Sequence, residues 1–106
     1  MATTFVNAIS RGVGIAEVVS FTAPEKSIVI GGSLTNKLST TVPVTLIIRR
    51  GTDDTYIQKD RREDSDDPFE LMKGNKLVLN TGDKLVVSSK VENSIDVVFS
   101  ILQGVS

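Results

Sequence analysis

Cysteine and histidine are both absent from this chain. Without cysteine there is no disulfide framework and no thiolate metal site, so the fold depends on side-chain burial and backbone pairing. Without histidine the chain lacks the commonest general base, the usual partner of serine and cysteine nucleophiles, and the commonest transition-metal ligand. The two absences together predict a protein that is not an enzyme and that holds no cofactor and no metal.

Aromatic side chains and excess charge of one sign are also lacking. The sequence has one tyrosine and no tryptophan, and 12 Lys and Arg stand against 13 Asp and Glu, for a net charge of -1. Such a chain offers few stacking platforms and no long-range attraction to nucleic acid or anionic membranes. No apolar run approaches the roughly 18 to 20 residues of a membrane span, and the N-terminus lacks a signal-peptide pattern. We expect a soluble, not classically secreted protein that binds neither nucleic acid nor membrane.

Valine, isoleucine and threonine, in contrast, make up about a third of the 106 residues. These β-branched side chains pack well on a pleated sheet, and the length fits one domain. Short alternating segments separated by turn residues predict an all-β protein. We expect a single two-layer antiparallel β-sandwich or jelly-roll-like domain over residues 1–106, with about seven or eight short strands. Residues 1–15 are expected to form an N-terminal arm or edge strand.

The clearest pattern lies between residues 76 and 102. Leu77 and Leu79 precede Asn80–Asp83, whose glycine suits a tight turn, and the alternation resumes afterwards. This spacing predicts a hairpin, followed by a polar turn at residues 92–93 and a third strand. In that strand one face carries the apolar residues Ile95, Val97, Phe99 and Ile101. Val98 and Leu102 fall on the opposite face, which is expected to point outward.

Further strands are predicted at residues 3–10, 16–23, 27–36, 42–48, 55–58 and 69–72. Four expectations about faces follow from their alternation: Phe5 shares a face with Ile9; Val19 shares one with Phe21; Ile28, Ile30 and Leu34 share one; and Val42, Val44, Leu46 and Ile48 point inward while Ile47 points outward. The glycine pair at 31–32 suggests a bulge. The mixed-charge run Lys59–Asp67 is expected to be a solvated loop.

A metal site and a hydrolytic site are the chemical alternatives to a solvated loop. The acids Asp53, Asp54, Asp60, Asp64, Asp66 and Asp67 suggest a calcium site. Their spacing is not that of an EF-hand, however, and Arg61 and Arg62 compete for the same carboxylates. Nothing in the spacing pairs two acids for hydrolysis either. The glycines at 12 and 14 suit a turn better than a phosphate-binding loop.

Surface contacts remain as the candidate function. The outward residues Ile47, Val98 and Leu102 would leave apolar area on a sheet, which indicates either an interface or ordinary surface scatter. Arg49, Arg50, Arg61 and Arg62 would form a basic patch if their two turns met at one end of the sandwich. The alternative for these arginines is ion pairing with Glu63 or Asp64. These seven residues are the predicted protein–protein contacts.

Five segments, in order, carry a resemblance: TFVNAIS, TAPEKSIVIGGSLTN, VPVTLIIRRGTDDTYIQKD, NKLVLNTGDKLVV and SIDVVFSILQG. In that order and spacing they resemble small β-sandwich virion structural proteins of tailed bacteriophages. One departure is the charged DRREDSDDPFEL, where related-looking proteins have a short neutral link.

The resemblance implies a non-catalytic structural protein that assembles in many copies as a capsid decoration or cement protein, or as a neck, collar or tail component. It also implies a homo-oligomer whose partners are other virion proteins, located in the virion and assembled in the host cytoplasm. The alternative is a carbohydrate- or host-surface-binding module on a tail or fibre.

Overall fold

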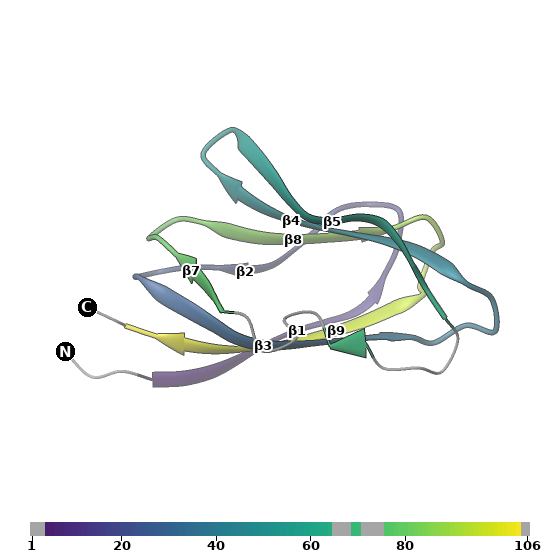
Figure 1. Cartoon of the computed structure of the whole chain (residues 1–106), viewed down its shortest axis with the longest axis horizontal. Helices are drawn as coiled ribbons and strands as arrows, with labels where there is room; N and C mark the ends of the chain where they lie inside the picture. The colour runs from purple at the N-terminus through teal and green to yellow at the C-terminus, as the bar shows by residue number, and fades with distance from the viewer. Residues whose placement is uncertain (1–3, 65–68, 71–75, 105–106) are drawn as a thin grey trace.

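The computed structural model describes residues 4–64, 69–70 and 76–104, and these residues form two stacked antiparallel sheets (Figure 1). The strands are β1 (Thr4–Val13), β2 (Val18–Thr22), β3 (Ser27–Asn36), β4 (Val42–Arg50), β5 (Asp53–Glu63), β6 (Phe69–Glu70), β7 (Leu77–Leu79), β8 (Lys84–Ser89) and β9 (Ile95–Gln103). The predicted all-β, two-layer class is therefore confirmed.

The order of the strands is that of a jelly roll. The five-stranded sheet runs β1-β9-β3-β6, with β7 also pairing with β3, and the four-stranded sheet runs β2-β8-β4-β5. The chain passes from one sheet to the other between β1 and β2, β2 and β3, and β3 and β4. It crosses again between β5 and β6, β7 and β8, and β8 and β9. Such crossings wrap two Greek keys into one double sheet.

The core lies between the two sheets and depends on the alternation of β9. Ile95, Val97, Phe99 and Ile101 are all buried, as the sequence predicted. They pack against buried side chains of the other sheet, which are Val42, Val44, Leu46, Leu85 and Val87. Burial of these branched side chains from both layers supplies the main driving force for folding.

The predicted hairpin at Asn80–Asp83 is wrong, although both of its strands exist. β7 pairs with β3, whereas β8 pairs with β2 and β4, so the turn crosses between the sheets. Its backbone is tied to the β2–β3 connection, because Gly82 donates to Ala23 O (2.7 Å) and Ala23 donates to Asp83 O (2.9 Å). The polar segment at residues 92–93 likewise leads from β8 across to β9.

Two predicted faces are wrong because bulges shift the alternation. The register of β2 with β8 slips between Val19 and Phe21, which leaves Val19 exposed and turns Phe21 toward the core. In β3 the slip lies between Val29 and Gly31, so Ile30 is exposed while Leu34 is buried. The glycine pair had indicated this bulge, but not its effect on the faces.

The predicted loop at Lys59–Asp67 is also wrong over its first half. β5 extends to Glu63 and pairs with β4 through Arg62 opposite Pro43. An edge strand accepts such charges because one side of its backbone and one face of its side chains meet water. Two register shifts and a positive φ of 49° at Asp60 bend it.

Some predicted positions lie outside the described residues. These are residues 1–3 of the N-terminal arm or edge strand predicted at 1–15, residues 65–67 of the charged run, and residues 71–72 of the strand predicted at 69–72. The first strand itself continues past Ser10 to Val13, after a register shift against β9.

An ion pair closes the end of the sandwich where the Asn80–Asp83 turn crosses. Arg50, the last residue of β4, donates from Nε and Nη2 to the Asp83 carboxylate, with the shortest contact at 2.7 Å. Asn80 N donates to the same carboxylate at 2.9 Å. The Arg50 hydrogen bonds lower the pKa of the nearly buried Asp83 below its usual range, and the bond from Asn80 adds to this.

Replacing Asp83 with alanine is expected to lower the free energy of unfolding by about 2 to 3 kcal/mol, because a buried acceptor of charged and backbone donors is lost. The Asp83 contribution is full above about pH 5 and is lost as the pH falls through 3.8 toward the lowered folded pKa. Urea unfolding of both proteins between pH 7 and pH 3 measures the difference.

The matched control is Asp53→Ala at the exposed tip of the neighbouring β4–β5 turn, which should change stability by less than about 0.5 kcal/mol. An equal loss at both positions, or a loss at Asp83 that does not depend on pH, would contradict the role assigned to this carboxylate.

Candidate protein-binding surface

The outer face of the five-stranded sheet carries aligned rows of apolar side chains. In the first row, the backbone register places Phe5 opposite Leu102, Leu102 opposite Ile28, and Ile28 opposite Val78. A second row places Ile9 opposite Val98. Between the rows, the bulge residue Ile30 is also exposed. We call this surface the docking face: Phe5, Ile9, Ile28, Ile30, Val78, Val98 and Leu102.

The docking face is well exposed along the edge formed by β1. Phe5 is 74% exposed and Ile9 is 56% exposed. Taking the strand spacing and rise into account, the apolar rows cover roughly 300 Å², which is comparable to the largest apolar patch of a typical monomer. Patches of this size are often functional.

The docking face is also free of charge. Two apolar rows and the Asn7–Ser100–Gly31 row between them cross β1, β9, β3 and β7, and none of these rows contains an ionisable residue in those strands. The Ile9 row continues into β6, where its next residue is Glu70. The nearest described ion pair is Lys37–Asp96 at 3.5 Å, beyond the Ile9 row. A partner can therefore cover this surface without desolvating a charge.

The apolar centre of the outer face of the four-stranded sheet, in contrast, is buried. Its central row aligns Val19, Val86, Ile47 and Tyr56. The middle two side chains are 1% and 4% exposed although they lie outside the core cluster. Ile47 points outward as predicted, but it offers almost no surface to a partner.

An ion-pair chain explains this burial. Arg49 Nη2 lies 3.2 Å from Glu17 and its Nε lies 2.7 Å from Asp54. Glu17 precedes Val18, which pairs with Val87 on one side of Val86 in β8. Arg49 pairs with Lys84, on the other side of Val86. The Glu17–Arg49 ion pair therefore crosses over the row that contains Val86. The hydrogen bond with Asp54 raises the pKa of Arg49, and the same bond lowers the pKa of Asp54. Charged groups thus cover the apolar centre of this sheet.

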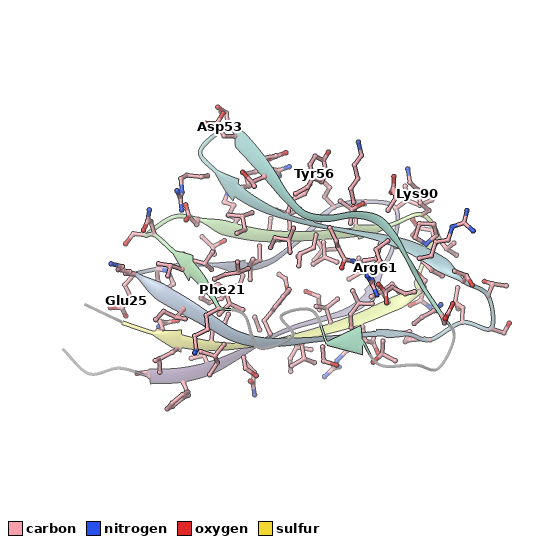
Figure 2. The ribbon with its side chains drawn as sticks, in the orientation of Figure 1. Phe21, Glu25, Asp53, Tyr56, Arg61 and Lys90 are labelled. Atoms are coloured by element: carbon pink, nitrogen blue, oxygen red, sulfur yellow. The ribbon has the colours of Figure 1, made fainter. Side chains whose placement is uncertain are left out.

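Tyr56 projects from the outer side of the same sheet (Figure 2). The ammonium of Lys59 lies 5.2 Å from the centre of its ring. A cation–π contact of this kind covers one face of the ring. Tyr56 therefore keeps one ring face that Lys59 does not cover, and it is the single tyrosine of a chain without tryptophan.

The structure does not bring the four predicted arginines together. Arg49 and Arg50 lie opposite Asp54 and Asp53 at one end of the β4–β5 ladder, and Arg62 lies opposite Pro43 at the other end. Seven residues of strand separate the two ends, or about 23 Å. The basic patch expected from their meeting is therefore not formed.

Each arginine pair has local acidic partners instead. Besides binding Asp83, Arg50 lines a pocket of about 350 Å³ with Ile48, Asp53 and Thr55. The charge of Arg50 at this pocket is already paired with the Asp83 carboxylate through Nε and Nη2.

Among the described residues of the charged run, Lys59 to Asp64, Glu63 is the buried carboxylate. It ends β5 opposite Val42, and its side chain is buried. Arg61, opposite the inward Val44, lies on the side of β5 that faces the other sheet (Figure 2). Arg61 Nε lies 3.1 Å from Oε1, yet this oxygen accepts no well-directed hydrogen bond. Burial raises the pKa of Glu63 above its usual value, against the opposing charge of Arg61. The predicted Arg61–Glu63 ion pair is confirmed.

Neither a metal site nor a membrane span is found in the described part of the chain. Residues 4–64, 69–70 and 76–104 contain no group of three or more His, Cys, Asp or Glu arranged to hold an ion. Asp66 and Asp67, which belonged to the weighed calcium set, lie outside these ranges. The same residues include no helix with the length and hydropathy needed to cross a bilayer.

Comparison with known proteins gives no relative for this chain: no family model, curated protein or solved structure matches it. The function is therefore inferred from the chain's own residues.

Sequence reasoning found Val98 and Leu102 of the docking face and missed Ile28, Ile30 and Val78. The shared face of Phe5 and Ile9 was visible in the alternation. Which way that face points depends on the pairing of β1 with β9, which no local pattern contains.

Replacing Glu63 with glutamine is expected to stabilise the protein at neutral pH, because the buried charge disappears while the shape is kept. A raised folded pKa means that the folded state binds the proton more tightly, so wild-type stability rises as the pH falls through that pKa toward 4.5. The variant's advantage should therefore be largest at pH 7.5 and smallest below pH 4.5. Thermal unfolding across this range measures it, and an advantage that grows on acidification would contradict the assignment.

Proposed function

We propose that this protein is a non-catalytic structural component of a tailed-phage particle, attached in many copies to the capsid, neck or tail through its docking face. The observation that carries the proposal is the contrast between the two sheets. On one outer face the apolar centre, Val86 and Ile47, is buried near the ion pairs of Arg49 with Glu17 and Asp54, while the other face presents uncharged apolar rows to solvent. In an isolated monomer such rows are a liability, and in an assembly they are an interface.

The fold and the sequence add support of a weaker kind. Jelly rolls occur in viral capsid proteins, but also in lectins and cupins, so topology alone does not select among them. The five segments from TFVNAIS to SIDVVFSILQG resemble phage virion proteins. A rigid sandwich that docks onto a symmetric array needs only weak individual contacts, because repetition multiplies them.

The proposal predicts that one charge on the docking face abolishes attachment. Val98→Asp places a carboxylate at a position 38% exposed in the second apolar row, so a partner would have to bury it. Purified protein is added to phage particles that lack it, and bound protein is measured after sedimentation of the particles. We expect wild-type protein to bind and Val98→Asp to lose at least tenfold in affinity.

Val19→Asp is the matched control, since Val19 is 48% exposed on the outer face of the opposite sheet. It should bind as wild type does, and both variants should unfold at similar urea concentrations. Wild-type protein that does not add to particles, or equal losses from both variants, would overturn the proposed docking face.

A further inference from the structure

β1 leaves one side of the five-stranded sheet open. It is the first strand in the order β1-β9-β3-β6, and within the described residues no strand pairs with its outer side (Figure 1). Its register with β9 is unbroken from Thr4 to Ser10. An edge strand of this kind presents a row of backbone donors and acceptors to which another strand can bind.

The other described edges are protected in the ways that sheet proteins commonly use. β2 is five residues long and interrupted by a bulge. β5 carries Asp53, Asp54, Lys59, Asp60, Arg61, Arg62 and Glu63 along its length and has two register shifts. β6 and β7 span two and three residues. The segment Thr4–Ser10 of β1 has no charge, no proline, no glycine and no bulge.

The sequence of this edge is complementary to its own reverse. Read against itself in the antiparallel direction about Asn7, TFVNAIS places Phe5 opposite Ile9, Val6 opposite Ala8, and Asn7 opposite Asn7 of the other strand. The large apolar side chains then meet on one face and the small apolar side chains on the other. No charge opposes another, and cross-strand apolar pairs of this kind stabilise sheets.

We propose that β1 pairs antiparallel with β1 of a second copy, around a twofold axis at Asn7. Such an interface is isologous, because each strand presents the same residues to its partner in reverse order. Pairing is limited to about Phe5–Ile9, since the Ser10 hydroxyl donates to Ser20 Oγ of β2 at 2.9 Å, where the edge begins to be covered.

The pairing joins two five-stranded sheets and makes their docking faces continuous. Phe5 and Ile9 of one copy lie beside Ile9 and Phe5 of the other, so the apolar face doubles to roughly 600 Å². The seam of five paired residues is only about 17 Å long, so the area that it buries falls below the 1,200 Å² or more of stable interfaces. The dimer is therefore weak in dilute solution and gains strength on an array. It does not depend on which virion protein the docking face contacts.

Single cysteines test the register directly, because the natural chain has none. Paired residues of antiparallel strands have Cα atoms about 4.5 to 5.5 Å apart, within the range of a disulfide. Asn7→Cys should therefore form a disulfide-linked dimer under mild oxidation of concentrated protein. Phe5→Cys alone and Ile9→Cys alone should not, since equivalent residues lie about 14 Å apart along the strands. An equal mixture of the Phe5 and Ile9 variants should crosslink.

Charged substitutions at Phe5 and Ile9 provide a second test, which measures reversible association. Phe5→Lys with Ile9→Lys in one chain places like charges opposite each other and should abolish association in sedimentation equilibrium. Phe5→Lys with Ile9→Glu in one chain places opposite charges together twice and should restore it. Both substituted positions are solvent-exposed in the monomer, and urea unfolding of each variant tests whether it folds.

Two results would overturn the proposed pairing: Asn7→Cys that stays monomeric while the two charge variants associate equally, or Phe5→Cys that crosslinks to itself as readily as Asn7→Cys. If the protein attaches to particles but forms no dimer, the strand pairing is rejected and the docking face stands. Loss of attachment with the dimer intact would reject only the docking face.

Discussion

The period of two along a β-strand is the constraint on which this structure depends. Every strand of a two-layer sandwich that buries one set of side chains must present the other set on an outer face. On the four-stranded sheet, the outward Val86 and Ile47 are covered by the ion pair between Glu17 and Arg49. On the five-stranded sheet, Phe5, Ile9 and Val98 remain exposed and uncharged. The four-stranded sheet buries its outward apolar centre within the chain, whereas the five-stranded sheet leaves apolar rows exposed to solvent.

The alternation of apolar residues correctly predicted which side chains point inward in strands of regular register. The inward face of β9 and the outward position of Val98 and Leu102 follow from a regular period over nine residues. The faces of β2 and β3 could not be predicted, because bulges near Ser20 and Ile30 change which side chains point inward. A bulge is a property of two paired strands, and the partner strand is far away in the sequence.

The topology was beyond local reasoning for the same physical cause. Asn80–Asp83 has the composition of a hairpin turn, but the backbone bonds of Ala23 with Gly82 and Asp83, together with the ion pair from Arg50, hold it across the end of the sandwich. These partners come from residues 33 to 60 positions away. The charged run behaved similarly, because Arg61 and Glu63 became strand residues through pairing with β4. In both cases pairing between residues far apart in the sequence determined the structure, against the local preference for a hairpin turn or a loop.

The central claim is that the outer face of the five-stranded sheet, and not that of the four-stranded sheet, is covered in the assembled particle. Hydroxyl-radical footprinting of the purified protein and of intact virions, read by mass spectrometry, tests it residue by residue. The account predicts that labelling of Phe5, Ile9 and Leu102 falls strongly on assembly while labelling of Tyr56 is unchanged. Protection of Tyr56 with continued labelling of Phe5 and Ile9 would contradict it.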